Sequence, residues 1–217
     1  MARLRQELYR PFLTSLPISG ASVAVILSSG PPITLCASDP VAARIDELHF
    51  ELGEGPQWSS VRTGKLVMIA DISAHGHDEW PVFRAGLSGL QVHSLFCVPM
   101  RMEATTIGVA TLHSASRLEL TATQQATALS IASDIAGEAA DQALLSANDD
   151  TGAPSRGSPA LRREVHHATG VMLVQLNTTP EIAYARLQAY AFASGRTVLA
   201  VARDVVAGLI RFDETNP

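Results

Sequence analysis

The sequence predicts an α+β fold in which an antiparallel sheet flanked by helices is followed by a small three-helix bundle. Two observations lead to this fold class. Residues 21–146 run in the order strand, strand, helix, strand, helix, strand, strand, helix, with β-branched strand patterns and helical apolar spacing. Residues 161–217 follow a stretch rich in Ser, Asp, Gly and Pro and contain three short helical patterns.

The first two strands are expected to pair as a hairpin. The β-branched run at 21–28 ends in a Ser-Gly-Pro-Pro turn at 29–32, and ITLCAS follows as the second strand. Residues 40–50 have helical spacing and LGEGPQW is typical of a loop. SSVRTG then predicts a short helix that Gly64 closes.

Three further strands and two helices follow. LVMIADI, VHSLFCVPMRM and TIGVATLHS predict the strands, and WPVFRAGLSGL predicts a helix. A long helix extends from Thr121 to about Ser146, with many alanines and no proline. We predict that its small apolar stripe packs on the same helix of a second copy in a homodimer; the alternative is that it packs only on its own sheet. The stripe comprises Leu129, Ala132, Ala136, Ala139 and Ala143.

The composition of residues 146–160 predicts a linker between a sensory domain at 1–145 and a helical domain at 161–217. The three helices behind the linker are expected to end near Leu176, Gly195 and Leu209. Each begins at a residue suited to cap a helix, and proline follows the first two caps. The caps are Ser158, Thr179 and Thr197.

The whole chain is typical of a reduced cytoplasmic protein. It has 217 residues, of which 47% are apolar, which is enough for one large or two small packed domains. No apolar run approaches the roughly 20 residues of a membrane span, and the N-terminus lacks a signal-peptide pattern. Cys36 and Cys97 are too far apart for metal or redox spacing.

The net charge of −5 is unevenly distributed along the chain. Residues 1–150 contain 9 Lys and Arg and 16 Asp and Glu, a net charge of −7. Residues 151–217 contain 7 and 5, a net charge of +2. The C-terminal part is therefore the one suited to a polyanion, although +2 is far from a strongly basic footprint.

One segment has the composition of a metal site. His75-Gly76-His77-Asp78-Glu79 offers the His-x-His pattern of zinc ligands, but its place between a strand and a helix favours a solvated loop. Neither a GxGxxG nor a GxxxxGK[ST] loop occurs, and no nucleophile–base pair is evident. We therefore expect no metal, no cofactor and no catalysis.

Residues 15–145 resemble the GAF family of small sensory domains. The resemblance rests on Gly53-Glu54-Gly55-Pro56, Arg62 to Lys65, Val67 to Asp71, Phe96 to Met100 and Ile107 to Leu112. It implies a small-molecule pocket, which we expect between the sheet and the segment from Gly53 to Trp80, without bound metal. It does not imply a ligand, and the pattern of cyclic-nucleotide GAF domains is absent.

Residues 161–212 resemble the ANTAR family, the output domain of transcription antitermination regulators. The resemblance begins with Arg162, Val165, Ala168 and Gly170 to Leu173. It continues through Ala183, Leu187, Tyr190-Ala191, Arg196, Val198 and Val201-Ala202. It implies binding of structured RNA with paired short-looped hairpins, usually by a dimer, which prevents a terminator hairpin from forming.

The RNA-binding candidates that this resemblance implies are Arg162, Arg163, Thr169, Gly170, Tyr190, Arg196 and Arg203. Thr169 stands where the family has lysine, and Gln188 and Thr197 also replace commonly basic residues. Because phosphate contacts supply much of nucleic-acid affinity, these changes should weaken RNA binding. Tyr190 could stack on a base or belong to the core.

Gly170 raises a specific question, because a glycine within a helix costs about 1 kcal/mol relative to alanine. Its missing side chain would let either a neighbouring helix or a nucleotide approach closely.

Two other functions stay open for the C-terminal part. One is DNA binding by a helix-turn-helix around Gly195, and the other is a protein-interaction module whose RNA surface has decayed.

Overall fold

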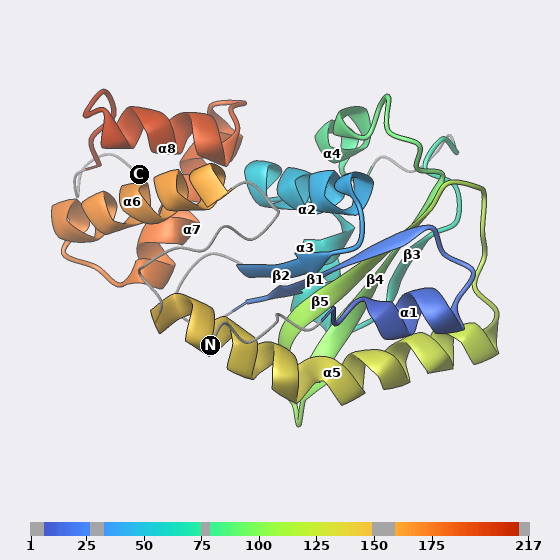
Figure 1. Cartoon of the computed structure of the whole chain (residues 1–217). Coiled ribbons are helices and arrows are strands. Elements are labelled where there is room, and N and C mark those ends of the chain that lie inside the picture. Colours follow the sequence, from blue (N-terminus) through green and yellow to red (C-terminus); the bar gives the residue numbers. More distant parts are fainter. Residues whose placement is uncertain (1–6, 27–32, 75–78, 149–158, 213–217) are drawn as a thin grey trace.

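The computed structural model describes residues 7–26, 33–74, 79–148 and 159–212, with the backbone alone at 147–148, 159–163 and 181. One antiparallel sheet has the strand order β2-β1-β5-β4-β3 (Figure 1). Its strands are β1 (Gly20–Val25), β2 (Ile33–Ala37), β3 (Val67–Ile69), β4 (Ser94–Met102) and β5 (Thr105–Ser114). The helices are α1 (Arg10–Ser15), α2 (Pro40–Leu52), α3 (Pro56–Thr63), α4 (Pro81–Gly86), α5 (Ala122–Asn148), α6 (Pro159–Leu176), α7 (Pro180–Ala193) and α8 (Val198–Val206).

The predicted antiparallel sheet flanked by helices is confirmed, with shifted boundaries. β1 and β2 pair as expected for a hairpin, although their turn at 29–32 lies outside the described residues. α3 begins three residues earlier than predicted, because Pro56 already supplies the φ angle of a first helical turn. α1 was not predicted, since a helix of six residues is too short to show an apolar period.

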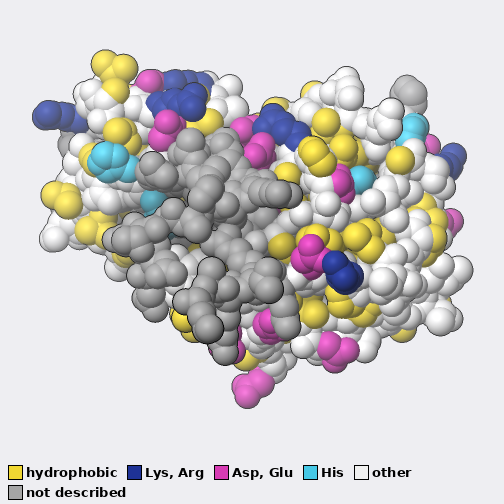
Figure 2. All heavy atoms as spheres, viewed as in Figure 1, with side chains coloured by type: hydrophobic (Ala, Val, Ile, Leu, Met, Phe, Trp, Pro, Cys, Tyr) yellow, Lys and Arg dark blue, Asp and Glu magenta, His cyan; other side chains and the backbone are white. Residues whose placement is uncertain are grey.

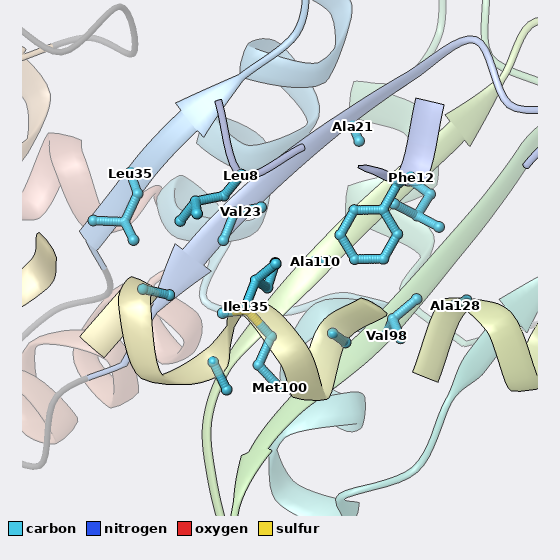
Figure 3. Packing of buried hydrophobic residues seen from close by; sticks show 14 of the residues in the cluster. Leu8, Phe12, Ala21, Val23, Leu35, Val98, Met100, Ala110, Ala128 and Ile135 are labelled. Atoms are coloured by element: carbon cyan, nitrogen blue, oxygen red, sulfur yellow. The ribbon is translucent and has the colours of Figure 1, made fainter. Parts of the chain in front are cut away.

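α5 and α1 cover one face of the sheet (Figure 1). Figure 3 shows Phe12 of α1, Ile135 of α5 and Met100 of β4 in one buried cluster. The prediction that the small apolar stripe of α5 forms a dimer interface was wrong for four of its five residues. Ala132, Ala136, Ala139 and Ala143 are buried in this cluster, and only Leu129 is exposed. Small side chains let α5 approach the sheet closely, so the stripe packs within one chain.

The opposite face of the sheet is covered by α2 and α3, and α4 packs against α2 (Figure 1). Asp39 caps α2, since its side chain accepts hydrogen bonds from the N–H groups of Val41 and Ala42, both at 2.9 Å. α2 then directs Ile45 and Leu48 into a cluster with Phe83 of α4 and Leu95 of β4.

Helices α6, α7 and α8, which we call the C-terminal helical unit, pack on one another around a second core. The N-terminus of α8 is capped by Thr197, whose Oγ1 accepts a hydrogen bond from the N–H of Ala200 at 3.1 Å. Met172, Leu187 and Val201 supply one buried side chain from each helix. Most of the predicted linker, residues 149–158, lies outside the described residues.

The two cores meet at the C-terminal end of α2. Phe50 of α2 is buried in the core of the C-terminal helical unit, and Trp58 of α3 packs against that core. α2 also contacts α8 directly. In Figure 1 the C-terminal end of α2 points at these helices. Among the described residues, no helix has the length and apolar character that a membrane crossing requires.

Candidate functional site

A row of small polar side chains crosses the sheet beneath α2 and α3. The strand register aligns Ser22 of β1 with Thr111 of β5, and Thr111 with Cys97 of β4. Side chains alternate along a strand, and Ala21 and Val23 point into the α5 core, so Ser22 points to the α2–α3 side. Thr111 Oγ1 and Cys97 Sγ lie 4.0 Å apart on that side.

Gln57 and Ser60 of α3 and Asp46 of α2 add further polar groups to this layer, and all three are buried. Ser60 Oγ lies 2.9 Å from the carbonyl oxygen of Lys65 and 3.1 Å from that of Cys97, which ties α3 to the sheet. Within the described part of the chain, Ser22 Oγ and Gln57 Oε1 are buried without a hydrogen-bond partner. A buried polar atom without a partner costs about 1–3 kcal/mol, so this layer is suited to a ligand that forms hydrogen bonds.

The two thiols are not reactive groups at neutral pH. Burial raises the pKa of Cys97 far above its usual range, and burial raises the pKa of Cys36 to about 11. Both thiols therefore stay protonated at neutral pH. The nucleophilic form, the thiolate, is not populated. Cys97 packs with Ala24 and Val109 as a small apolar residue.

His49 of α2 organises the loop between α2 and α3. Its Nδ1 lies 3.0 Å from the carbonyl oxygen of Ile45, an acceptor, so Nδ1 carries the proton. Its Nε2 accepts a hydrogen bond from the N–H of Gln57 at 3.3 Å, and its ring centroid lies 4.2 Å from that of Phe83. Complete burial lowers the pKa of His49 to about 3, which keeps the ring neutral.

The loop itself needs its glycines. Gly55 has a φ of 119°, and a Cβ there would lie 2.6 Å from Cδ2 of His49. Glu54 Oε1 accepts a hydrogen bond from the N–H of Phe83 at 3.0 Å, which joins the loop to the start of α4. The Gly-Glu-Gly-Pro sequence is thus used for a loop conformation that touches α2, α3 and α4.

The segment with the composition of a metal site cannot be placed, because residues 75–78 lie outside the described part of the chain. Among the described residues, no group of three or more His, Cys, Asp or Glu is arranged to hold a metal ion.

In the C-terminal helical unit, α6 carries both Thr169 and Gly170. Thr169 is only 4% exposed, and its hydroxyl donates a hydrogen bond to the carbonyl oxygen of Val165 at 2.8 Å. Gly170 is exposed, and apart from its chain neighbours and the backbone of its own helix no described atom lies within 4 Å of a Cβ built there. No neighbouring helix uses the missing side chain, so close packing within the described chain does not explain this glycine.

Two of the candidate arginines form ion pairs on the surface. Arg196 lies 2.6 Å from Asp204, and Arg203 of α8 lies 2.6 Å from Glu164 of α6. Figure 2 shows basic side chains, which are all arginines in this part of the sequence, over these helices with acidic side chains beside them. The side chains of Arg162 and Arg163 lie outside the description, although their backbone belongs to α6. The pair between Arg203 and Glu164 brings α8 to the start of α6.

Tyr190 is half-buried, and its ring packs edge to face on Phe212 with a centroid distance of 5.2 Å. It therefore contributes to the edge of the core.

An open hollow of about 590 Å³ lies along the exposed side of α6. The residues that line it are His166, His167, Gly170, Val171, Val174 and Gln175.

The family of the larger part of the chain is decided by a comparison with protein families. The sequence profile of the GAF domain matches residues 12–139, which is more than half of the chain. The chain belongs to the GAF domain family. Its GAF domain includes the sheet, α2 to α4 and most of α5. GAF domains are sensors that are common in signalling and regulatory proteins, and they often bind small molecules.

Two solved structures that are similar to this chain have low sequence identity to it. A domain of a protein described as a two-component sensor histidine kinase from Sinorhizobium meliloti is 15% identical over 69% of this chain and 99% of its own, with a TM-score of 0.49. The GAF domain of a phosphoenolpyruvate-protein phosphotransferase from Coxiella burnetii is 15% identical over 68% and 88%, also with a TM-score of 0.49. No curated protein matches the chain. The GAF match ends within α5, so α6 to α8 lie outside it.

Sequence analysis missed two features of the site, the buried His49 and the contact that Phe50 and Trp58 make with the C-terminal helical unit. One signal was present in the sequence. Ala42, Ile45 and Leu48 define the apolar face of α2, and Phe50 lies off that face. A large aromatic residue on the outer side of a helix indicates a second contact.

Proposed function

We propose that this protein is a cytoplasmic regulator in which the GAF domain senses a small molecule and the C-terminal helical unit binds structured RNA. The ANTAR resemblance of residues 161–212 supports antitermination as the outcome. The proposed domains are 1–145 and 161–217, with the linker at 146–160 between them. Regulation occurs by binding, without catalysis.

The exposed Gly170 in the middle of α6 is the observation that carries the proposal. This glycine lowers the stability of the helix by about 1 kcal/mol relative to alanine, and no described part of the chain packs against it. An external partner that approaches the α6 backbone closely would account for it. A sugar–phosphate backbone is such a partner, because it can contact helix backbone where no side chain intervenes.

The ion pairs of Arg196 and Arg203 do not prevent them from binding phosphate. Both arginines are exposed, and surface pairs of this kind contribute only about 0–1 kcal/mol. Phosphate groups could replace Asp204 and Glu164 at little cost. RNA affinity should then depend steeply on salt, since each neutralised phosphate releases counterions.

The test is a salt series with a synthetic RNA carrying two short-looped hairpins, and with duplex DNA of equal length. We expect the RNA to bind more tightly, and Arg196→Ala or Arg203→Ala to reduce the slope of log K against log salt by about one unit. Preference for the duplex DNA would instead support a DNA-binding regulator. Absence of RNA binding at low salt would refute the proposal.

Gly170→Ala distinguishes binding from folding. The substitution should stabilise the free chain by about 0.5–1 kcal/mol and weaken RNA binding about tenfold, because the new methyl group occupies the contact. Gly137→Ala in α5 is the matched control, since Gly137 is also a helical glycine whose Cβ position has no described atom within 4 Å apart from its chain neighbours and the backbone of its own helix. It should stabilise the chain equally and leave RNA binding unchanged.

A second candidate function, protein interaction, is favoured by the exposed apolar side chains of the C-terminal helical unit. Val174, Phe192 and Leu209 are each more than three-quarters exposed. Such side chains favour association with an apolar partner surface. They also offer the homodimer a surface other than the buried stripe of α5. Light scattering of wild type and Phe192→Ser tests this: dissociation of a dimer by the substitution would support it.

A further inference from the structure

We propose that the GAF domain controls the C-terminal helical unit by direct docking, and that the docked arrangement in this structure is the state that excludes RNA. The docking patch consists of Phe50, Gly53 and Trp58. A change in the loop between α2 and α3 releases the C-terminal helical unit, which then binds RNA. The RNA part of this inference rests on the proposed function, whereas the docking itself does not.

The docking patch is built as an interface between two cores. Phe50 is 8% exposed although it lies off the apolar face of α2, because it is buried among residues of the C-terminal helical unit. A Cβ on Gly53 would lie 3.0 Å from Nε2 and 3.6 Å from Cγ of Gln188 in α7. Trp58 adds an indole ring that packs against the same core. All three residues lie at the ends of α2 and α3 that flank the loop.

The interior of the GAF domain fixes the position of this patch. Trp58 Nε1 donates a hydrogen bond to the carbonyl oxygen of His49 at 2.8 Å, and the N–H of Gln57 donates to the His49 ring. Phe50 is the next residue after His49. Gln57 is also one of the buried polar residues of the layer beneath α2 and α3, and its Oε1 has no partner among the described residues. A ligand that bonds to Gln57 therefore acts on the segment that carries Trp58.

Electrostatics explains why the docked state excludes RNA. Residues 1–145, the GAF domain, contain 9 Lys and Arg and 14 Asp and Glu, a net charge of −5, and docking holds this acidic domain against the helices. Glu51 precedes Gly53 by two residues and Glu54 follows it, so both carboxylates belong to the segment that forms the contact. RNA phosphates within about 8–10 Å of these carboxylates are repelled at physiological salt. Release moves the acidic domain away from the helices that carry Arg196 and Arg203, whose ion-pair partners are then the remaining nearby carboxylates.

A reversible disulfide across the contact tests the proposal in one protein. In Gly53→Cys/Gln188→Cys the two sulfur atoms should meet, because the Cβ position of residue 53 is 3.6 Å from Cγ of residue 188. We expect the disulfide to form under mild oxidation in the full chain. The oxidised protein should bind the two-hairpin RNA about tenfold more weakly than the reduced protein, and reductant should restore binding. The single-cysteine variants are the controls and should not respond to oxidation.

Phe50→Ala provides a second variant, which does not depend on a disulfide. It weakens docking and, at a temperature where circular dichroism shows that α6 to α8 are still folded, should tighten RNA binding relative to wild type. In a Trp80→Phe background, Trp58 is the single tryptophan, and its emission should shift to longer wavelength in Phe50→Ala as the indole becomes exposed to water. Glu47→Gln, on the same helix, is the control for an α2 substitution outside the docking patch.

The outcomes separate the docking from the proposed function. Failure of the disulfide to form, together with unchanged Trp58 emission in Phe50→Ala, would show that the docked arrangement is absent in solution. A disulfide that forms without altering RNA affinity would overturn RNA exclusion while leaving the proposed function intact. A disulfide that forms in a protein that binds no RNA, oxidised or reduced, would overturn both the proposed function and RNA exclusion, and would confirm docking alone.

Discussion

His49 shows how one buried residue makes stability depend on pH. Both ring nitrogens are committed in the neutral form, since Nδ1 donates to Ile45 and Nε2 accepts from Gln57. Protonation would place a second N–H against the N–H of Gln57. The folded pKa of about 3 lies below the ordinary value of 6.5, so between these values only the unfolded chain binds this proton.

We therefore predict that the free energy of unfolding falls by about 1.4 kcal/mol per pH unit as pH decreases below 6.5, through this residue alone. Urea unfolding of wild type and His49→Gln at pH 7.5 and 5.5 measures it. In the variant, the free energy of unfolding should differ much less between the two pH values than it does in wild type. His167→Gln, at an exposed position on α6, is the control and should retain it. An equal pH dependence in wild type and His49→Gln would contradict the assignment.

Gly55 is a second residue with a specific structural requirement. Its φ of 119° is unfavourable for any side chain, and a Cβ would lie 2.6 Å from the His49 ring. Gly55→Ala should destabilise the protein by about 2–4 kcal/mol. Thermal unfolding followed by circular dichroism checks the value. Gly137→Ala should raise the unfolding temperature in the same assay, so a loss in both variants would count against the argument.

At the scale of elements, the buried stripe of α5 is the clearest case. Ala136 is 1% exposed and lies in the core between α5 and the sheet. Ala136→Leu should destabilise the fold by about 1–3 kcal/mol, because the extra atoms have no space. Ser133→Leu, on the exposed side of α5, should cost little. A normal unfolding temperature together with an altered oligomeric state in Ala136→Leu would contradict this argument. It would support the predicted dimer interface on the α5 stripe instead.

At the scale of the whole molecule, α2 belongs to two cores at once. Leu48 is buried in the GAF domain, whereas Phe50, two residues later, is buried in the C-terminal helical unit. Removing a buried phenylalanine costs about 3–5 kcal/mol. Phe50→Ala should therefore lower the unfolding midpoint of α6 to α8 and leave that of the sheet nearly unchanged.

Hydrogen exchange of backbone amides resolves the two parts within the full chain. Leu48→Ala is the matched control, since it lies on the same helix and should lower protection in the GAF domain instead. Loss of protection in the sheet alone, after Phe50→Ala, would contradict the shared role of α2.

The sequence by itself determined the kind and order of most elements. β-branched runs identified the five strands, and the caps at Thr179 and Thr197 located the starts of α7 and α8. The Gly-Glu-Gly-Pro segment predicted a loop, and the structure places that loop in contact with His49. These features are local, since propensity, caps and turn residues act over a few neighbouring positions.

Only the tertiary structure decided which surface each element presents. The α5 stripe could equally have met its own sheet or a second copy, because apolar spacing shows that a face is buried but not what buries it. Thr169 was expected at a surface and is buried, whereas Gly170 beside it is open. Phe50 is buried in the core of the C-terminal helical unit, not in the GAF core that α2 otherwise packs against. Such contacts join residues more than a hundred positions apart, and their geometry depends on the packing of whole elements rather than on local sequence.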